Sequence, residues 1–316
     1  MSVVSASNAA PSGARVFTGV AVAVSAVSSA AIFVRFADAP PLAVSFWRCF
    51  AGALFFATAA GVQRRRQMGP AVDVVALPHG AAAAAGVLLA LHFATWITSL
   101  HHTSVAISVV LVCTQPIFVT LASGLFLDEK PPWLSWVGIA VAFAGAAGVA
   151  LAGDSSSSPA TSSLVLGPGL ALAGAVFVAG YMLLSRASRR RGAPLAPFAA
   201  AVYFHAAWAL ALLSVAFDQP LWGYTSSTWG WILCLSLLPQ VVGHTLLHWA
   251  MAHVPAALLS SAILLEPVLS TLFAHWFLDE TPPASVVGFA VLVMVGLLVM
   301  LKAQASAPPP SEAANV

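Results

Sequence analysis

Two ionisable side chains stand inside long apolar runs of the sequence, where charge is scarce. Glu266 lies between ALLSSAILL and PVLSTLFAHWF, and Arg48 is the centre of FWRCF. In a membrane-spanning run an acidic side chain costs about 2.5 to 3.5 kcal/mol, so it is expected to face a polar pathway. We therefore predict a proton or substrate site at Glu266. A protonated acid that only packs two helices together is the alternative.

The guanidinium of Arg48 suggests a different chemistry, because it can bind a carboxylate through two hydrogen bonds. This favours a role as the partner of an anionic substrate group. Arg48 also lies near the start of its apolar run, where a long side chain can reach the membrane interface. A structural salt bridge and an interfacial anchor therefore stay open as alternatives.

Three polar residues lie four positions apart in another apolar run, at Gln240, His244 and His248. On an α-helix this spacing puts them on one face. Two histidines at that spacing can bind zinc, but no HExxH motif or cysteine cluster supplies the further ligands. We therefore predict no metal and no cofactor, and interpret the stripe as a polar lining that relays protons with Glu266.

Two residues of the third apolar run are candidates for the same pathway. His92 is expected to join the polar lining. Trp96 is expected to stack against a planar or cationic group of a substrate, with core packing as the alternative.

Composition identifies the environment of these residues. Only 7% of the 316 residues are charged, 60% are apolar, and the mean hydropathy is +0.94. Ordinary soluble domains have about 25% charged residues, so we predict an integral membrane protein embedded in a lipid bilayer. The net charge of +2 gives no reason to expect nucleic acid as a partner.

The apolar runs predict an all-α protein of ten transmembrane helices, since a helix needs about 20 residues to cross a bilayer. The expected spans are 16–34, 42–62, 80–99, 104–126, 133–152, 164–185, 195–217, 229–250, 256–277 and 284–301.

Lysine and arginine in the short loops predict the orientation. With the N-terminus in the cytoplasm, Arg35 is the one such residue in an outer loop. The tails 1–15 and 303–316 are then both cytoplasmic. The residues placed on the cytoplasmic side are Arg15, Arg64, Arg65, Arg66, Lys130, Arg186, Arg189, Arg190, Arg191 and Lys302.

The sequence also repeats itself. FLDEKPP at 126–132 returns as FLDETPP at 277–283, 151 positions later. A fixed offset of this kind indicates duplication. We predict two five-helix repeats, 16–152 and 164–302, joined by an external linker at 153–163. Five is odd, so the second repeat is expected to be inverted, as in many secondary transporters.

The same offset pairs residues within the fourth and ninth spans. Pro116 pairs with Pro267, and Gln115 takes the place of Glu266 in the first repeat. Proline has no N–H to donate, so both prolines predict helix kinks that expose backbone carbonyls. If Gln115 and Glu266 both line the pathway, only one repeat offers a titratable group there.

Several of these features together resemble the EamA-type permeases of the drug/metabolite transporter superfamily. They are the two five-helix repeats, Arg48 in the second helix, TQP at 114–116, LEP at 265–267, and a small-residue last helix after each acidic turn. The resemblance implies a carrier of small organic metabolites, often an exporter of amino acids. It also implies a location in the bacterial inner membrane.

We therefore expect a permease that moves a small amino-acid-like molecule by alternating access, with proton coupling through Glu266 as a hypothesis. Small residues in 133–152 and 284–301 either form a homodimer seam or pack within one chain. The alternative is an intramembrane enzyme that acts on a lipid or membrane-embedded substrate. No nucleophile–base pair can be assembled from the sequence, which favours the transporter.

Overall fold

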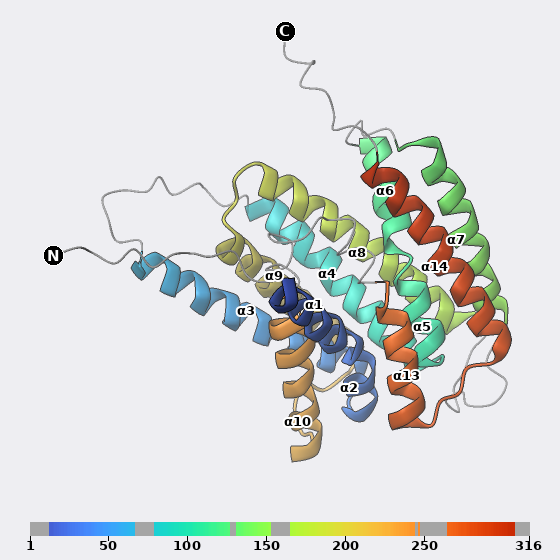
Figure 1. Cartoon of the computed structure of the whole chain (residues 1–316). Helices are drawn as coiled ribbons and strands as arrows, with labels where there is room; N and C mark the ends of the chain where they lie inside the picture. Colours follow the sequence, from blue (N-terminus) through green and yellow to red (C-terminus); the bar gives the residue numbers. More distant parts are fainter. Residues whose placement is uncertain are drawn as a thin grey trace, which may run out of the picture.

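The described part of the chain is entirely helical. The computed structural model describes residues 13–66, 79–126, 131–152, 165–243, 246 and 264–306, and none of these forms a strand. The helices are α1 (Gly13–Ser28), α2 (Ala30–Phe36), α3 (Pro41–Arg66), α4 (His79–Ser99), α5 (Val105–Val112), α6 (Gln115–Phe126), α7 (Trp133–Ala152), α8 (Leu166–Arg190), α9 (Leu195–Ala216), α10 (Ser226–Leu235), a π-helix η1 (Ser236–Gly243), α13 (Glu266–Leu278) and α14 (Ala284–Ala305) (Figure 1).

Within these residues, eight helical segments are long and apolar enough to cross a bilayer. The predicted spans 229–250 and 256–277 are not among the eight, and each lies partly outside the described residues. The outer surface of the bundle is apolar, as lipid contact requires. Phe17, Trp133 and Leu151 are each at least 75% exposed. The protein is therefore a multi-pass membrane protein.

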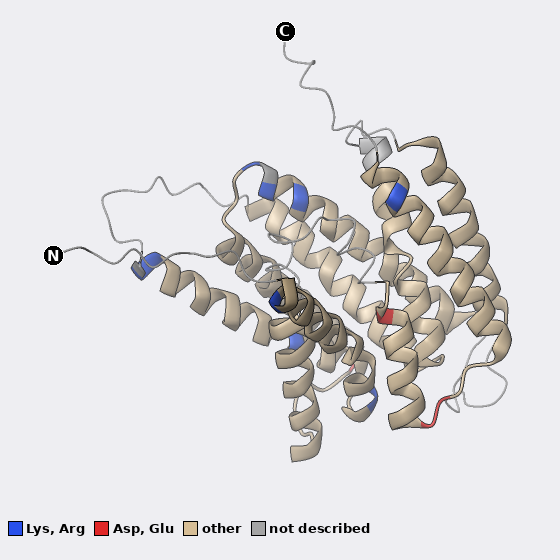
Figure 2. Ribbon diagram, viewed as in Figure 1, with Lys and Arg blue, Asp and Glu red and all other residues tan. Residues whose placement is uncertain are grey.

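Charged residues are few and concentrate at helix ends. In Figure 2 the basic segments at the ends of α3, α8 and α14 lie toward the top and left of the view, and an acidic segment follows α13 at the lower right. The lengths of the helices between these ends are almost free of charge.

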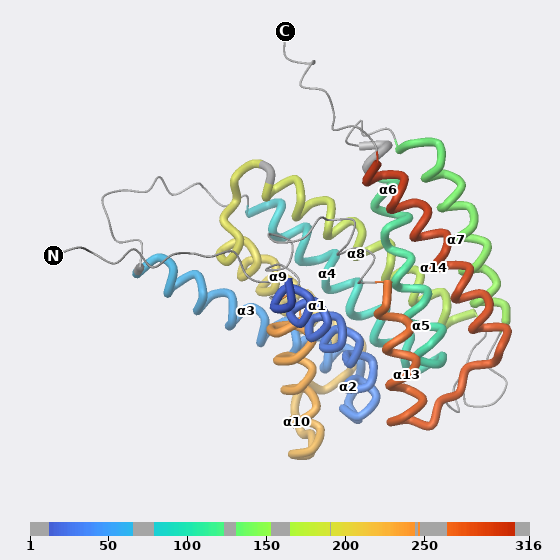
Figure 3. The backbone as a smooth tube through the Cα atoms, viewed as in Figure 1, coloured from blue at the N-terminus to red at the C-terminus, as the bar shows by residue number. Residues whose placement is uncertain are grey.

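Two of the predicted spans contain a break in the helix. The span predicted at 16–34 consists of α1 and α2, which meet at Ser29. The span predicted at 104–126 consists of α5 and α6, divided at Cys113 and Thr114 (Figure 3). There Thr114 N bonds to Leu111 O at 3.2 Å, one residue closer than in an α-helix. Pro116 follows and has no N–H with which to continue the ladder.

Helices from the two ends of the chain pack side by side. The helix α7 lies along α14 at one edge of the molecule, α3 lies along α9, and α4 packs against α8 and α9 (Figure 1). Glycines allow the closest approach: a Cβ on Gly296 would lie 2.4 Å from Ala142 N. The small residues of α7 and α14 therefore pack within one chain.

Candidate functional site

Arg48 is the buried charge around which the other predicted residues gather. It lies in the second turn of α3 and only 3% of it is exposed. Its Nε donates to Gln240 Oε1 at 2.7 Å, and its guanidinium carbon lies 4.2 Å from the ring centroid of Phe93. The alternative of an interfacial anchor is therefore wrong, because the side chain is held inside the bundle.

Three hydrogen-bond donors at this site have no acceptor among the described residues. They are Arg48 Nη1, Trp96 Nε1 and Gln240 Nε2, all on side chains at least nine-tenths buried. Buried polar atoms are nearly always paired in native proteins, so unpaired donors mark a place that a ligand or water completes. A carboxylate fits, since it only accepts hydrogen bonds and neutralises the guanidinium.

Gln240 is positioned by an unusual stretch of helix. It lies in the π-helix η1, which contains Pro239. Proline cannot donate to the carbonyl four residues earlier, and its ring clashes there, so the helix widens. Gln240 Nε2 then lies against α3 at Gly52, where a Cβ would be 2.4 Å away. The contact between the two helices depends on residue 52 having no side chain.

The wider helix covers only the first residue of the predicted polar stripe, Gln240. The spacing of Gln240, His244 and His248 was interpreted with an α-helical period, whereas residues 236–243 have π geometry. His244 and His248 lie outside the described residues. Within the described residues no three His, Cys, Asp or Glu side chains could hold a metal ion.

His92 and Trp96 form a stacked pair on α4. Their rings are nearly parallel, 4° apart, with centroids separated by 6.1 Å. His92 Nδ1 lies 2.9 Å from Gly174 O on α8, which fixes the ring as the Nδ1–H donor. Trp96 turns toward Arg48, whose guanidinium carbon is 5.9 Å from its ring centroid. The pair therefore joins α8 to the Arg48 site.

Glu266 and Gln115 occupy equivalent places in the two halves. Each is the first residue of a helix, α13 and α6, and each is followed by proline. The helix α13 begins at Glu266, and residues 256–263, which would show how deep Glu266 lies in its predicted span, are outside the described part. At a helix N-terminus the backbone dipole favours a carboxylate.

Glu266 lies within electrostatic reach of Arg48 and of Cys113. Among the described residues the two opposite charges make no direct ion pair, as Arg48 Nη1 is unpaired. A substrate that carries both an ammonium and a carboxylate could be bound between them.

Sequence reasoning missed the partners that hold Arg48. Phe93, which lies under the guanidinium, and Tyr203, whose ring lies beside Gly52, stand in apolar runs, where an aromatic residue is ordinary. Gly52 offered a signal, because it lies one helical turn after Arg48 on the same face. The packing of α3 against α4, α9 and η1 decides which of these residues lie near Arg48, and no local pattern in the sequence predicts that packing.

Comparison with known proteins gives three findings. Residues 15–151 match the EamA-like transporter family, and residues 165–302 match it a second time. A relative described as a probable terminal-alkyne amino-acid exporter, from Streptantibioticus cattleyicolor, is 27% identical over 202 residues. That match covers 63% of this chain and 65% of the relative.

A solved crystal structure shares the fold. It superposes with a TM-score of 0.60 over 91% of this chain and 96% of its own, at 22% sequence identity. This likeness concerns the arrangement of helices only.

Proposed function

The chain belongs to the EamA-like transporter family, and from that premise we propose that it is a secondary transporter that exports a small amino-acid-like metabolite by alternating access. The exporter from Streptantibioticus cattleyicolor supports the amino-acid class of substrate. We place the protein in the inner membrane with both termini in the cytoplasm, on the basis of the arginines at the ends of α3 and α8. The family also favours a transporter over the intramembrane enzyme.

One observation carries the proposal. Arg48 is buried in the bundle, held by Gln240 from one side and by Phe93 from another, and its Nη1 has no acceptor among the described residues. A charge is costly in this environment and persists where it has a function. The substrate carboxylate is the acceptor for this Nη1.

The packing of the helices supports two inverted five-helix repeats. Under the 151-residue offset α3 corresponds to α9, and α7 to about the position of α14. Both pairs pack along one another, as equivalent helices do beside a two-fold axis. The same offset relates α1 to α8, and α4 to the segment that contains α10 and η1. Accordingly, α1 packs on η1, and α8 packs on α4. Arg48 and Gln240 come from different repeats, so the site lies where the repeats meet.

The mechanism uses the two charges in turn. The substrate carboxylate binds Arg48, its ammonium group faces Glu266, and its side chain packs on Phe93 and Trp96. One repeat then rocks against the other and exposes the site to the opposite side. Protonation of Glu266 weakens its hold on the ammonium group and couples release to the proton gradient.

Flux of labelled amino acids in proteoliposomes tests the proposal, with aromatic and aliphatic substrates compared. We expect saturable flux that falls at least tenfold in Arg48→Gln, because the carboxylate loses its partner. Arg64→Gln is the matched control, since Arg64 is exposed near the end of the same helix. Flux that is equal in Arg48→Gln and Arg64→Gln would remove Arg48 from the substrate site.

Glu266→Gln addresses proton coupling separately. We expect flux in the wild type to rise with an imposed pH gradient, and flux in Glu266→Gln to ignore it. A gradient that drives both proteins equally would exclude Glu266 as the coupling group.

A further inference from the structure

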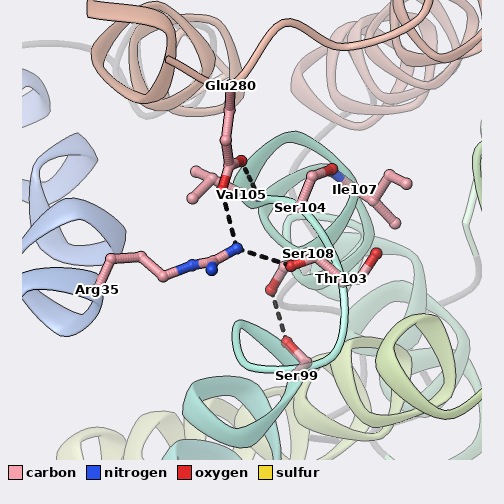
Figure 4. A network of polar contacts seen from close by, with 8 residues as sticks. All are labelled: Arg35, Ser99, Thr103, Ser104, Val105, Ile107, Ser108 and Glu280. Atoms are coloured by element: carbon pink, nitrogen blue, oxygen red, sulfur yellow. Dashed lines mark hydrogen bonds and ion pairs between the residues drawn. The ribbon is translucent and has the colours of Figure 1, made fainter. Parts of the chain in front are cut away.

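A second polar cluster lies at another end of the bundle, beside the segment that joins α13 to α14 (Figure 4). Arg35, in the last turn of α2, places Nη2 2.9 Å from Glu280 Oε1. The same Nη2 donates to Thr103 O at 3.0 Å. The other carboxylate oxygen, Glu280 Oε2, accepts from Val105 N at 2.8 Å. One ion pair thus ties together three parts of the chain.

The chemistry of this cluster makes it strong. Val105 is the first residue of α5, so the carboxylate of Glu280 sits at a helix N-terminus, where the dipole favours negative charge. The side chains are 18% and 9% exposed, for Arg35 and Glu280 respectively. Hydrogen bonds between ionised groups are shorter and stronger than neutral ones, and partly buried pairs are screened less than exposed ones.

The cluster joins the two repeats. Arg35, Thr103 and Val105 belong to the first family match, and Glu280 to the second. The contact is between residues far apart in the sequence, since Glu280 lies 175 positions from Val105. A separation of the two repeats at this end therefore breaks the ion pair.

At their other ends, the two helices of the cluster reach Glu266 and the neighbourhood of Gln115. The helix α13 begins with Glu266 and ends at Leu278, two residues before Glu280. The helix α5 begins with Val105 and ends at Val112, three residues before Gln115. A rigid helix transmits a displacement of one end to the other. A displacement of Glu266 on substrate binding therefore also displaces Glu280.

We propose that Arg35 and Glu280, with the backbone groups of Thr103 and Val105, form a latch that closes the transport pathway at this membrane face and opens once in each transport cycle. A charge-assisted contact is either made or lost, and packed helix interfaces switch between discrete arrangements, which gives two distinct states. The latch rests on the proposed alternating-access function and adds to it the groups that close one side.

The test measures the separation of the two repeats at this face. Spin labels on Asp38→Cys and Ser285→Cys, both exposed positions near the latch, report the distance by pulsed electron paramagnetic resonance. The native cysteines Cys49, Cys113 and Cys234 are replaced by alanine in every protein. The variants compared are Glu280→Gln, Arg35→Lys and the control Asp279→Asn.

We expect one short distance to predominate in the unmodified latch, and the population at longer distance to rise at least threefold in Glu280→Gln. Arg35→Lys keeps the charge but cannot hold Thr103 and Glu280 in the same geometry, so a smaller rise is expected. Asp279→Asn removes an adjacent exposed charge, and asparagine tolerates the positive φ of 55° found there. Its distances should match those of the parent.

The latch is overturned if folded Glu280→Gln has the distance distribution of the parent, even when its melting temperature falls, because a purely structural ion pair would behave in that way. If Glu280→Gln does not fold, unchanged distances in Arg35→Lys overturn it equally. The distances need no substrate. An absence of amino-acid flux therefore refutes the proposed substrate and leaves the latch standing. Unchanged distances refute the latch and leave the proposed substrate standing.

Discussion

At the scale of single residues, Gly52 decides where Gln240 can lie and hence how Arg48 is held. A Cβ at residue 52 would be 2.4 Å from Gln240 Nε2 and 3.2 Å from the ring of Tyr203. In Gly52→Ala the Gln240 side chain must move, because it is the flexible partner. Arg48 Nε then loses its acceptor, and the guanidinium is free to turn.

We predict that Gly52→Ala folds with a melting temperature near that of the parent and loses most of its transport, about tenfold. Alanine in a helix is favoured over glycine by roughly 0.5 to 1 kcal/mol, which offsets part of the crowding. Gly61→Ala, on the same helix with open space around it, is the control and should keep its flux. Equal flux in the two variants would mean that Gln240 does not position Arg48 for transport.

The sequence identified the charged members of the site because charge inside an apolar run is conspicuous. Arg48 and Glu266 could be selected on that ground alone. Phe93, which packs under the guanidinium, could not, since aromatic residues in apolar runs are ordinary. Hydropathy shows which residues are unusual in a membrane and gives no information about which apolar residues touch them.

At the scale of elements, breaks in the helices position the site. The π-helix η1 turns Gln240 toward Arg48, and α6 and α13 each begin at a polar residue that precedes proline. Hydropathy predicted these spans as continuous, because a break within an apolar run changes neither its length nor its mean hydropathy. The proline positions were the available signal, and they indicated a kink without its geometry.

Pro239→Ala tests the role of η1. Alanine restores the N–H that proline lacks and lets the α-helical ladder continue from α10, which rotates Gln240 away from Arg48. We predict a melting temperature equal to or above that of the parent, since proline in a helix interior costs about 3 kcal/mol. Transport should nevertheless fall several-fold.

The control for this variant is Pro194→Ala. Pro194 is the N-cap of α9, where a backbone N–H makes no hydrogen bond within the helix. Undiminished transport by Pro239→Ala would show that the wide turn is incidental to the site. Circular dichroism and flux on the same preparation separate a change of helix from a loss of fold.

At the scale of the whole molecule, the contact between α7 and α14 holds the repeats together at one edge. A Cβ on Gly296 would lie 2.4 Å from Ala142 N, a backbone atom that cannot move without a shift of its helix. We predict that Gly296→Leu lowers the melting temperature in detergent by several degrees or prevents folding. Gly288→Leu, on the same helix with nothing within 4 Å, should melt like the parent. Similar melting of both variants would contradict close packing at this edge.

The sequence repeat extends the latch to a prediction about the opposite face. Arg186 stands 151 positions after Arg35, and Glu129, outside the described residues, stands 151 positions before Glu280. In alternating access only one face is open at a time. Weakening the contacts that close one face therefore favours opening there and closure of the other face. The charge of Arg186 should therefore act on the Arg35–Glu280 latch in the sense opposite to that of Glu280 itself.

With the same spin labels near Asp38 and Ser285, we predict that Arg186→Gln reduces the population at long distance, whereas Glu280→Gln increases it. Arg191→Gln is the control, since Arg191 is exposed in the segment after α8 and carries the same charge. The opposite signs follow from the coupling of the two faces, because a molecule that opens at one face must close at the other. An increase at long distance in both variants would contradict this coupling and would mean that the two faces move independently.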